Sequence, residues 1–282
     1  MAKITPEDVK KLRQKTDAGM LDCKKALEEA DGDFAKAERI LKEKGLASAG
    51  KRMDRATSEG SAFCVVQPDK AVILEIGCET DFVSKTDQFK ALGENLGKTI
   101  LEKNLKEAND ELLLPLKEAV AVLKENLTLK RFKVFPLSSD ETVSTYLHNG
   151  GQIGVMVKAK VGNLKDNDAV KAFLFDCAMH IAAMGPLYLN KDSVTSEYIK
   201  EQEEIFVKKT ALDEKTASKP ENVRANIAKG MLNKHLSEIC FMEQAFVKDP
   251  SMTVAQKMVA VAKEAGGNIS IEDFACYRVG VE

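Results

Sequence analysis

A strand-to-helix pattern occurs twice in this chain, and its two copies align at a constant offset of 81 residues. The apolar strand pattern at 72–76 falls opposite the one at 153–157, and the helix pattern from Phe89 falls opposite the one from Val170. Chance amphipathicity can produce such a match, but a duplication explains two blocks in the same register better. We therefore predict an α+β fold whose core consists of two similar subdomains.

The first 45 residues carry helical signals only. Thr5-Pro6 supplies a helix cap followed by proline at the first helical position, and apolar residues then recur at helical spacing. Gly45 is predicted to end the third helix, and small and polar residues follow it. The predicted division is a three-helix module at 1–45, a linker at 46–60, a first core subdomain at 61–140 and a second core subdomain at 141–282.

The segment 196–238 departs from the repeated pattern, because it contains two charged helical stretches around a break at 213–220. It carries eight acidic and eight basic residues. A sparse apolar seam predicts that the two stretches pair as an antiparallel helical hairpin inserted in the second subdomain. The seam consists of Ile199, Phe206, Val223, Ile227 and Met231. A pair of plain solvated helices is the alternative, and the sequence barely separates the two.

The charge balance and the aromatic content argue against a nucleic-acid partner. The chain has 42 Lys and Arg residues against 44 Asp and Glu residues, for a net charge of −2. Proteins that bind nucleic acid usually carry a cationic excess that neutralises phosphates. With 12 Phe, 4 Tyr and no Trp, there is also little material for base stacking. We expect no direct contact with nucleic acid.

The sequence also shows no membrane helix, no signal peptide and no cysteine pattern typical of disulfides. No stretch reaches the roughly 18 consecutive apolar residues of a membrane helix, and the amino terminus has no apolar signal core. The six cysteines are scattered, without any CxxC pair, as is typical of free thiols in a reducing compartment. We expect a cytoplasmic protein without a membrane partner.

The residues that enzymes use are sparse. The histidines are His148, His180 and His235, and no HExxH, GxSxG, GxGxxG or GxxxxGK[ST] motif occurs. An enzyme hypothesis would pair Cys78 as a thiol nucleophile with His180 as its base. Because Cys78 ends an apolar strand and His180 lies on the buried side of a helix pattern, we favour structural roles for both and predict no catalytic residue.

Three acidic residues near one strand end raise the question of a metal site. Glu75, Glu79 and Asp81 carry the oxygen ligands that hard cations prefer, but their spacing matches neither an EF-hand nor a two-metal site. A solvated strand end is the better interpretation. We therefore predict neither a metal nor a cofactor.

The loop Thr80-Asp81-Phe82-Val83 lies between a buried strand pattern and a helix cap at Thr86-Asp87. Two interpretations of Phe82 are almost equally favoured. Its ring either packs into the core, or it points outward as an apolar knob on a rigid support, which is the form of an interaction hot spot.

Several short motifs spread over the whole chain occur in combination. They are Leu12-Arg13, Thr16, Ala18-Gly19-Met20, Asp22-Cys23-Lys24-Lys25-Ala26-Leu27, Glu75, Cys78, Thr80-Asp81-Phe82-Val83, Glu125-Asn126, Tyr146, His148-Asn149-Gly150-Gly151-Gln152-Ile153-Gly154-Val155 and Met179-His180-Ile181-Ala182-Ala183. Together they resemble the elongation factor Ts family, the guanine-nucleotide exchange factors of bacterial translation. The three-helix module alone would indicate only a ubiquitin-associated-like fold.

The resemblance implies exchange by binding, without covalent chemistry. The chain would bind elongation factor Tu in its GDP-bound and nucleotide-free forms, displace Mg²⁺ and release GDP for GTP. The module and the first subdomain would grip the nucleotide-binding domain of that partner, and the second subdomain would hold another domain. The implied partner-binding residues are Thr80, Asp81, Phe82 and Val83 in a loop that enters near the partner's magnesium site, and Lys10, Arg13, Met20, Leu123 and His148 elsewhere.

Two residues depart from the family pattern. Leu21 stands where a second Met is common, and Gln152 replaces a frequent Arg; we also expect no carboxy-terminal module after the last strand. An adaptor for ubiquitin-like proteins, built on residues 1–45, is the other alternative. It leaves the remaining motifs unexplained.

Overall fold

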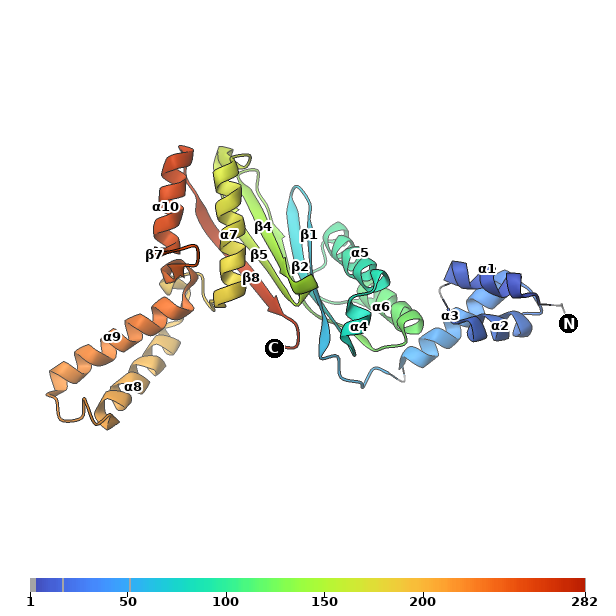
Figure 1. The fold of residues 1–282 in the computed structure, drawn as a ribbon, viewed down its shortest axis with the longest axis horizontal. Helices are drawn as coiled ribbons and strands as arrows, with labels where there is room; N and C mark the ends of the chain where they lie inside the picture. The colour runs from blue at the N-terminus through green and yellow to red at the C-terminus, as the bar shows by residue number, and fades with distance from the viewer. Residues whose placement is uncertain (1–3, 17, 51, 282) are drawn as a thin grey trace. The chain divides into compact units, whose positions relative to one another are not determined.

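The computed structural model describes residues 4–16, 18–50 and 52–281, and it divides into two compact units. Lys51, within the predicted linker, lies outside the described residues. Unit 1 comprises 1–136, 147–154 and 277–282, and unit 2 comprises 137–146 and 155–276. The fold is mixed α+β, as predicted, with three helices followed by sheets and further helices (Figure 1).

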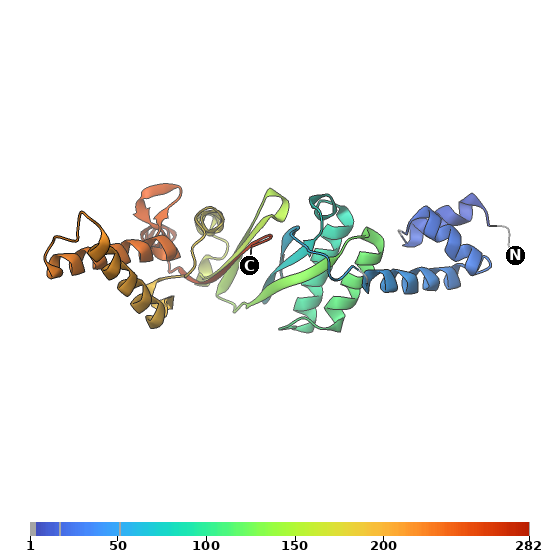
Figure 2. The same cartoon turned by 90° about the horizontal axis from the view of Figure 1, so that it is seen from below.

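Three helices form the amino-terminal module of unit 1 (Figure 2). They are α1 (Pro6–Thr16), α2 (Met20–Glu29) and α3 (Phe34–Gly50). The module has a small core of its own, centred on Leu12, Cys23 and Leu27. The helices were predicted correctly, but α3 does not end at Gly45 and includes the first residues of the predicted linker.

The reason for this difference is a tertiary contact of Gly45. A β-carbon at Gly45 would lie 2.5 Å from the β-carbon of Ala121, so the glycine is where α3 packs closely on another helix, α6. Gly45 therefore serves helix packing and not helix termination.

The sheet of unit 1 contains β1 (Glu59–Val66), β2 (Lys70–Cys78) and β3 (Leu127–Pro136), in the order β1-β2-β3. Both pairings are antiparallel, and the predicted turn after Val66 joins β1 to β2. The helices of this sheet are α4 (Asp81–Ser84), α5 (Asp87–Lys103) and α6 (Asp110–Leu123).

One face of the sheet carries the largest core of unit 1, and α5 and α6 cover that face (Figure 1). Alternate residues of β2, such as Val72, Leu74 and Ile76, point into it and are fully buried. Two glycines let α5 approach closely, because a β-carbon at Gly93 would lie 2.4 Å from the Phe63 ring and one at Gly97 would lie 2.5 Å from Val65.

Glu75 corrects the interpretation of a solvated strand end. Its side chain is buried in the middle of β2, where the Arg131 guanidinium donates to its carboxylate at 2.8 Å. Arg131 also donates to the carbonyl of Val281 at 2.8 Å and stacks over the Tyr277 ring at 4.5 Å. Glu75 is therefore part of a structural ion pair, and its partner Arg131 also binds the backbone at Val281. Burial raises the pKa of the Tyr277 hydroxyl to about 12.

Most of the second sheet belongs to unit 2. It contains β4 (Glu141–His148), β5 (Ile153–Lys160) and β8 (Ser270–Arg278), in the order β4-β5-β8. Its helices are α7 (Asp168–Met184) and α10 (Val254–Ala265), which contact each other. A short hairpin of β6 (Ala245–Phe246) and β7 (Asp249–Thr253) was not predicted. Short 3₁₀ turns lie at Asn149–Gly151, Gly162–Leu164, Lys191–Ser193 and Phe241–Glu243.

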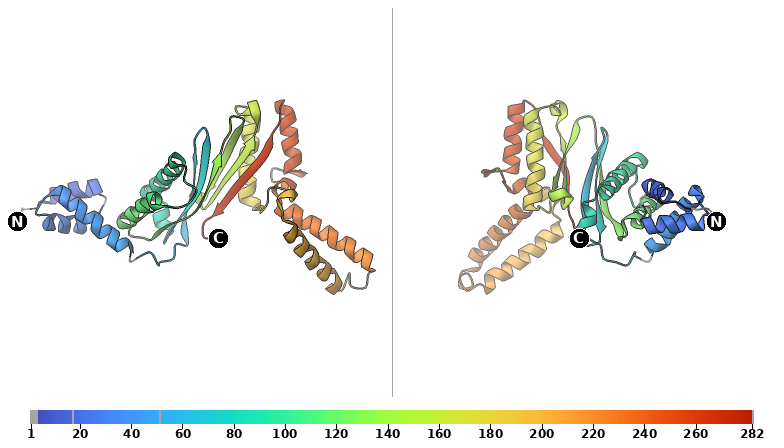
Figure 3. Two further views of the ribbon diagram at one scale, coloured as in Figure 1. Left: turned by 180° about the vertical axis from the view of Figure 1, so that it is seen from behind. Right: turned by 45° about the vertical axis from the view of Figure 1, so that its right-hand side comes forward.

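The charged segment forms the predicted helical hairpin. Helices α8 (Ser196–Leu212) and α9 (Glu221–Ile239) run antiparallel, side by side (Figure 3). The seam differs from the prediction, since Val223 is exposed while Ala228, Leu232 and Leu236 are buried. Among the described helices of the chain, none combines the length and apolar content that a membrane span requires.

His180 has the structural role predicted for it. It is fully buried on α7, where the backbone N–H of Val247 donates to its Nδ1 at 3.1 Å and its Nε2 lies 2.8 Å from Gln244 Oε1. Because Nδ1 accepts, Nε2 is the protonated nitrogen of a neutral ring. Burial lowers the pKa of His180 from the ordinary value of 6.5, since the charged form would lose its hydration.

Mild acidification should therefore destabilise unit 2. Above pH 6.5 the His180 ring is mainly neutral in both the folded and the unfolded chain. Below pH 6.5 the ring of the unfolded chain binds a proton more readily than the buried ring of the folded chain. The free energy of unfolding therefore falls as the pH is lowered. Hydrogen exchange of α7 amides, converted to opening free energies at pH 7.5 and 5.5, measures the effect. In His180→Gln, the decrease in opening free energy between pH 7.5 and 5.5 should become smaller by the contribution of His180. Replacing the exposed His148 by Gln should leave the decrease unchanged. An undiminished decrease in His180→Gln would contradict the assignment to His180.

Candidate functional site

The loop Thr80–Val83 is a helical turn and not an irregular loop. Asp81–Ser84 form α4, and the Thr80 hydroxyl caps its first turn by accepting from the N–H of Val83 at 3.5 Å. The Ser84 hydroxyl donates to the carbonyl of Asp81 at 2.8 Å, and that of Thr86 donates to the carbonyl of Val83 at 2.8 Å. Hydroxyl groups in the turn and on either side of it thus form hydrogen bonds with its backbone.

The orientation of this turn decides between the two interpretations of Phe82. The ring is 80% exposed, whereas Val83, the next residue, packs against the core under the sheet. One apolar residue therefore fastens the turn, and its neighbour points outward. Phe82 is an apolar knob on a rigid support.

Asp81 carries a negative charge next to this knob. Lys85 Nζ lies 2.5 Å from Asp81 Oδ2, an i,i+4 pair on the surface, and this hydrogen bond lowers the pKa of Asp81 below its ordinary range. Within the described residues, no cluster of His, Cys, Asp or Glu has the geometry to hold a metal ion. The turn thus presents an aromatic ring beside a carboxylate.

Two residues that the sequence motifs included without a role, Glu125 and Asn126, hold this turn in place. The Glu125 carboxylate accepts from the N–H groups of Glu79 and Thr80 at 3.1 and 3.0 Å. The backbone N–H of Asn126 donates to Glu79 at 2.7 Å. Sequence proximity gives no sign of these contacts, which join residues more than 40 positions apart.

The sequence-predicted residues of the module lie on its surface. Lys10 and Arg13 are exposed on α1, and Met20 is the first residue of α2, with 48% of its surface accessible. Met20 recurs at helical spacing with Cys23, Leu27 and Ala30, but those three face the core of the module and Met20 does not. Accessible Met side chains are common on binding surfaces.

The remaining predicted residues occupy two different environments. Leu123, at the end of α6, is partly buried against the core of unit 1. His148 is exposed at the end of β4, immediately before the Asn149–Gly151 turn. The structure gathers Thr80–Val83 around one turn, whereas Lys10, Arg13 and Met20 belong to a separate surface.

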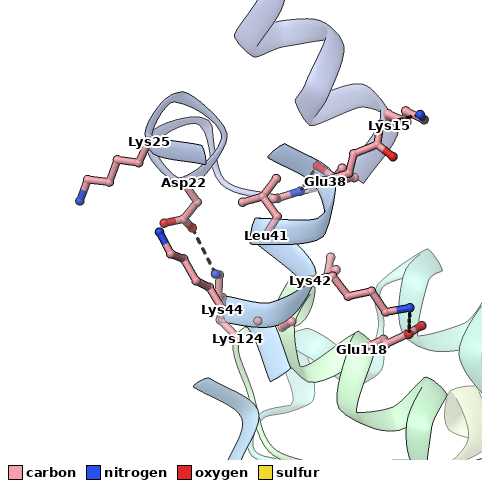
Figure 4. A pocket seen from close by; sticks show the side chains of 14 residues that line it. Lys15, Asp22, Lys25, Glu38, Leu41, Lys42, Lys44, Glu118 and Lys124 are labelled. Carbon is pink, nitrogen blue, oxygen red and sulfur yellow. Dashed lines mark hydrogen bonds and ion pairs between the residues drawn. The ribbon is translucent and has the colours of Figure 1, made fainter. Parts of the chain in front are cut away.

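A pocket of about 530 Å³ lies between the module and α6 (Figure 4). Ion pairs cross it from the module to the core: Lys42 with Glu118 at 2.6 Å, and Asp22 with Lys124 at 3.2 Å. Because these two ion pairs join the module to α6 and the turn after it, we interpret the pocket as part of the packing interface between the module and the core.

The thiol hypothesis does not fit the environment of Cys78. Its side chain is buried and donates to the carbonyl of Thr80 at 3.1 Å. Burial raises the pKa of the Cys78 thiol to about 12, so the thiolate that a nucleophile needs is not formed near neutral pH. Cys78 therefore belongs to the support of α4.

Comparisons with known proteins agree with one another. A sequence profile described as "Elongation factor TS" matches residues 79–281. "Elongation factor Ts" of Treponema denticola is 45% identical over 280 residues, which cover 99% of this chain and 99% of that protein. "Elongation factor Ts" of Borreliella burgdorferi strain B31 is 41% identical over 283 residues, with 99% of this chain and 100% of that protein covered. The similarity therefore includes the module, α4 and the α8–α9 hairpin.

Proposed function

The chain belongs to the elongation factor Ts family, and we propose that its own partner is elongation factor Tu, in the GDP-bound and nucleotide-free forms. Members of this family are nucleotide exchange factors for elongation factor Tu and act in translation without catalytic residues. Neither a nucleic acid nor a membrane is required for this function. The cytoplasm is the proposed location, because the partner works there.

The proposed mechanism uses binding energy alone. A GTPase holds GDP through contacts to the phosphates and through Mg²⁺, which bridges the phosphates and the protein. A factor that binds the partner better when its magnesium and phosphate sites are distorted weakens GDP binding by linkage, and GDP weakens factor binding to the same extent. Rebinding of GTP then releases the factor.

The observation that carries this proposal is the exposed Phe82 on the capped turn α4. An aromatic ring on a fixed support is suited to insertion between elements of the partner, and Asp81 beside it offers a charge that repositions a partner loop near the metal. Thr80 and Val83 hold the turn that carries both. Displacement of Mg²⁺ is the proposed consequence of this insertion.

The other predicted partner-binding residues lie outside α4. Lys10, Arg13 and Met20 on the module are proposed to bind the nucleotide-binding domain together with α4, and Leu123 and His148 are proposed to add contacts from the core. We further propose the predicted division into module, linker and core subdomains at 61–140 and 141–282, with the end of the module moved from 45 to Gly50, the last residue of α3, and with the two core subdomains arising by duplication. The matched order of β2 then α5 and of β5 then α7 supports that origin.

The function is tested by mixing the protein with elongation factor Tu that carries fluorescently labelled GDP. Stopped-flow fluorescence should show labelled GDP release accelerated by at least about tenfold, an effect of about 1.4 kcal/mol on the barrier. Raising the Mg²⁺ concentration should oppose the acceleration. Release at the rate of elongation factor Tu alone, at every concentration of the added protein, would refute the proposed function.

A further inference from the structure

The turn between α6 and β3 contacts three separate parts of unit 1 through three consecutive residues. The Lys124 ammonium pairs with Asp22 of the module at 3.2 Å. The Glu125 carboxylate binds the backbone before α4. The Asn126 side chain donates to the carbonyls of Met53 and Arg55, in the segment after the module, at 3.1 and 2.7 Å.

Glu125 supplies the hydrogen-bond acceptor that a neighbouring strand no longer provides after the end of β2. The antiparallel pairing of β2 with β3 ends at Cys78 and Leu127, so the N–H groups of Glu79 and Thr80 have no strand partner. Glu125 Oε2 accepts from both, at 3.1 and 3.0 Å. A carboxylate that accepts from backbone N–H groups forms hydrogen bonds about twice as strong as neutral ones.

The same carboxylate also fixes the cap of α4. Glu125 Oε1 accepts from the Thr80 hydroxyl at 2.6 Å, and the oxygen of that hydroxyl accepts from the N–H of Val83. With its proton committed to Glu125, the Thr80 hydroxyl has its lone pairs directed at the helical turn. Glu125 therefore determines the orientation of the residue from which α4 starts, two positions before Phe82.

A second hydrogen bond joins the same two segments in the opposite direction, from the backbone after α6 to a carboxylate after β2. The N–H of Asn126 donates to Glu79 Oε1 at 2.7 Å, while Glu79 Oε2 pairs with Arg55 at 3.3 Å. The bond from Asn126 is the main reason that the pKa of Glu79 lies below its ordinary range. Two acidic residues thus exchange hydrogen bonds across the end of the ladder, each with the backbone of the other segment.

We propose that Glu125 is a positioning residue for nucleotide exchange, which acts on the partner only through the orientation of α4 and Phe82. The inference rests on the proposed function and deepens it. Glu125 is partly buried behind the turn, whereas Phe82 is exposed in front of it. Loss of Glu125 frees α4 without removing the ring, so the partner still binds the rest of the protein but receives a misplaced Phe82.

The test separates positioning from binding by measuring labelled GDP release at rising concentrations of the full-length protein. Glu125→Ala should lower the maximal release rate by about tenfold, since a misplacement near 1 Å can cost up to about a hundredfold. The concentration at half-maximal rate should change less than about twofold, because the other contacts remain. Glu125→Gln, which keeps the length and one acceptor oxygen, should restore part of the rate.

A double-mutant cycle with Phe82→Ala identifies the route of the effect. If Glu125 acts through Phe82, the double variant is no slower than Phe82→Ala alone. Glu111→Ala, which removes an exposed acid of α6 that pairs with Lys103 of α5 at 3.5 Å, is the matched control and should leave both rate parameters unchanged. Circular dichroism melting of each variant verifies that the chain is folded at the assay temperature.

Two results would overturn the positioning role. One is a maximal rate in folded Glu125→Gln and Glu125→Ala equal to that of the unmodified protein. The other is additive losses in the double variant, which would mean that Glu125 acts independently of the ring. Both differ from failure of the proposed function, in which the unmodified protein itself does not accelerate release.

Discussion

Replacing Phe82 with alanine should lower the maximal rate of GDP release from elongation factor Tu by about tenfold to a hundredfold. Burying a phenylalanine ring contributes about 1.5–3 kcal/mol, and each 1.4 kcal/mol applied to the release barrier changes the rate about tenfold. Because the ring is largely exposed in the free protein, its removal leaves no cavity and the fold should be unaffected. Stopped-flow release of labelled GDP at saturating factor measures the rate.

The control for this experiment is an exposed apolar residue of similar size elsewhere in unit 1. Leu114 on α6 is 47% exposed, and Leu114→Ala should release GDP at the unmodified rate. Phe82→Leu should fall between the unmodified protein and Phe82→Ala, since it retains apolar volume without the ring. A folded Phe82→Ala variant with an unchanged maximal rate would contradict the proposed insertion of Phe82 into the partner.

Helix positions were predictable from the sequence because their signals are local. Thr86 caps α5 by accepting from the N–H of Phe89, and Gly185 ends α7 in the left-handed conformation with a φ of 58°. Asn109 caps α6 (Asp110–Leu123) by accepting from the N–H of Glu111. Caps and apolar periodicity lie within a few residues of the helix that they define.

The errors concern residues whose role depends on partners far away in the sequence. Gly45 was assigned to a helix end because glycine usually stands there, but its contact with Ala121 fixes its role. Glu75 was assigned to solvent, whereas Arg131, 56 positions later, pairs with it inside the protein. No local pattern contains either partner.

The candidate site shows the same limit. The sequence located Phe82 on a segment between a strand and a helix, but not the direction of its ring, because Phe82 and Val83 are both apolar and adjacent. In the structure, Val83 is the one that packs, partly buried, against the core. Glu125 belongs to the motif Glu125-Asn126, but nothing in the sequence indicated its role. An acidic residue after a helix is ordinary until the N–H groups of Glu79 and Thr80, which have no strand partner, are placed beside it.

Deletion of residues 1–50 should weaken binding to nucleotide-free elongation factor Tu by about a hundredfold, because linked binding surfaces gain about 10²–10⁴ in avidity. The remaining chain should stay folded, since the module has its own core and the sheet of unit 1 has another. Isothermal titration calorimetry gives the affinity, and hydrogen exchange of β2 tests the core. An affinity equal to that of the full chain would exclude the module from the interface.

A variant of the full chain separates the surface of the module from its mere presence. Lys10, Arg13 and Met20 are exposed, so their combined replacement by alanine should reproduce most of the loss while the module stays folded. The matched control replaces Lys24 and Lys36, which are also exposed on the module, and should bind normally. Normal binding by the triple variant, together with weak binding by the truncated chain, would mean that another face of the module contacts the partner. Equal losses in the triple and control variants would indicate that total positive charge, and not these three side chains, determines the affinity.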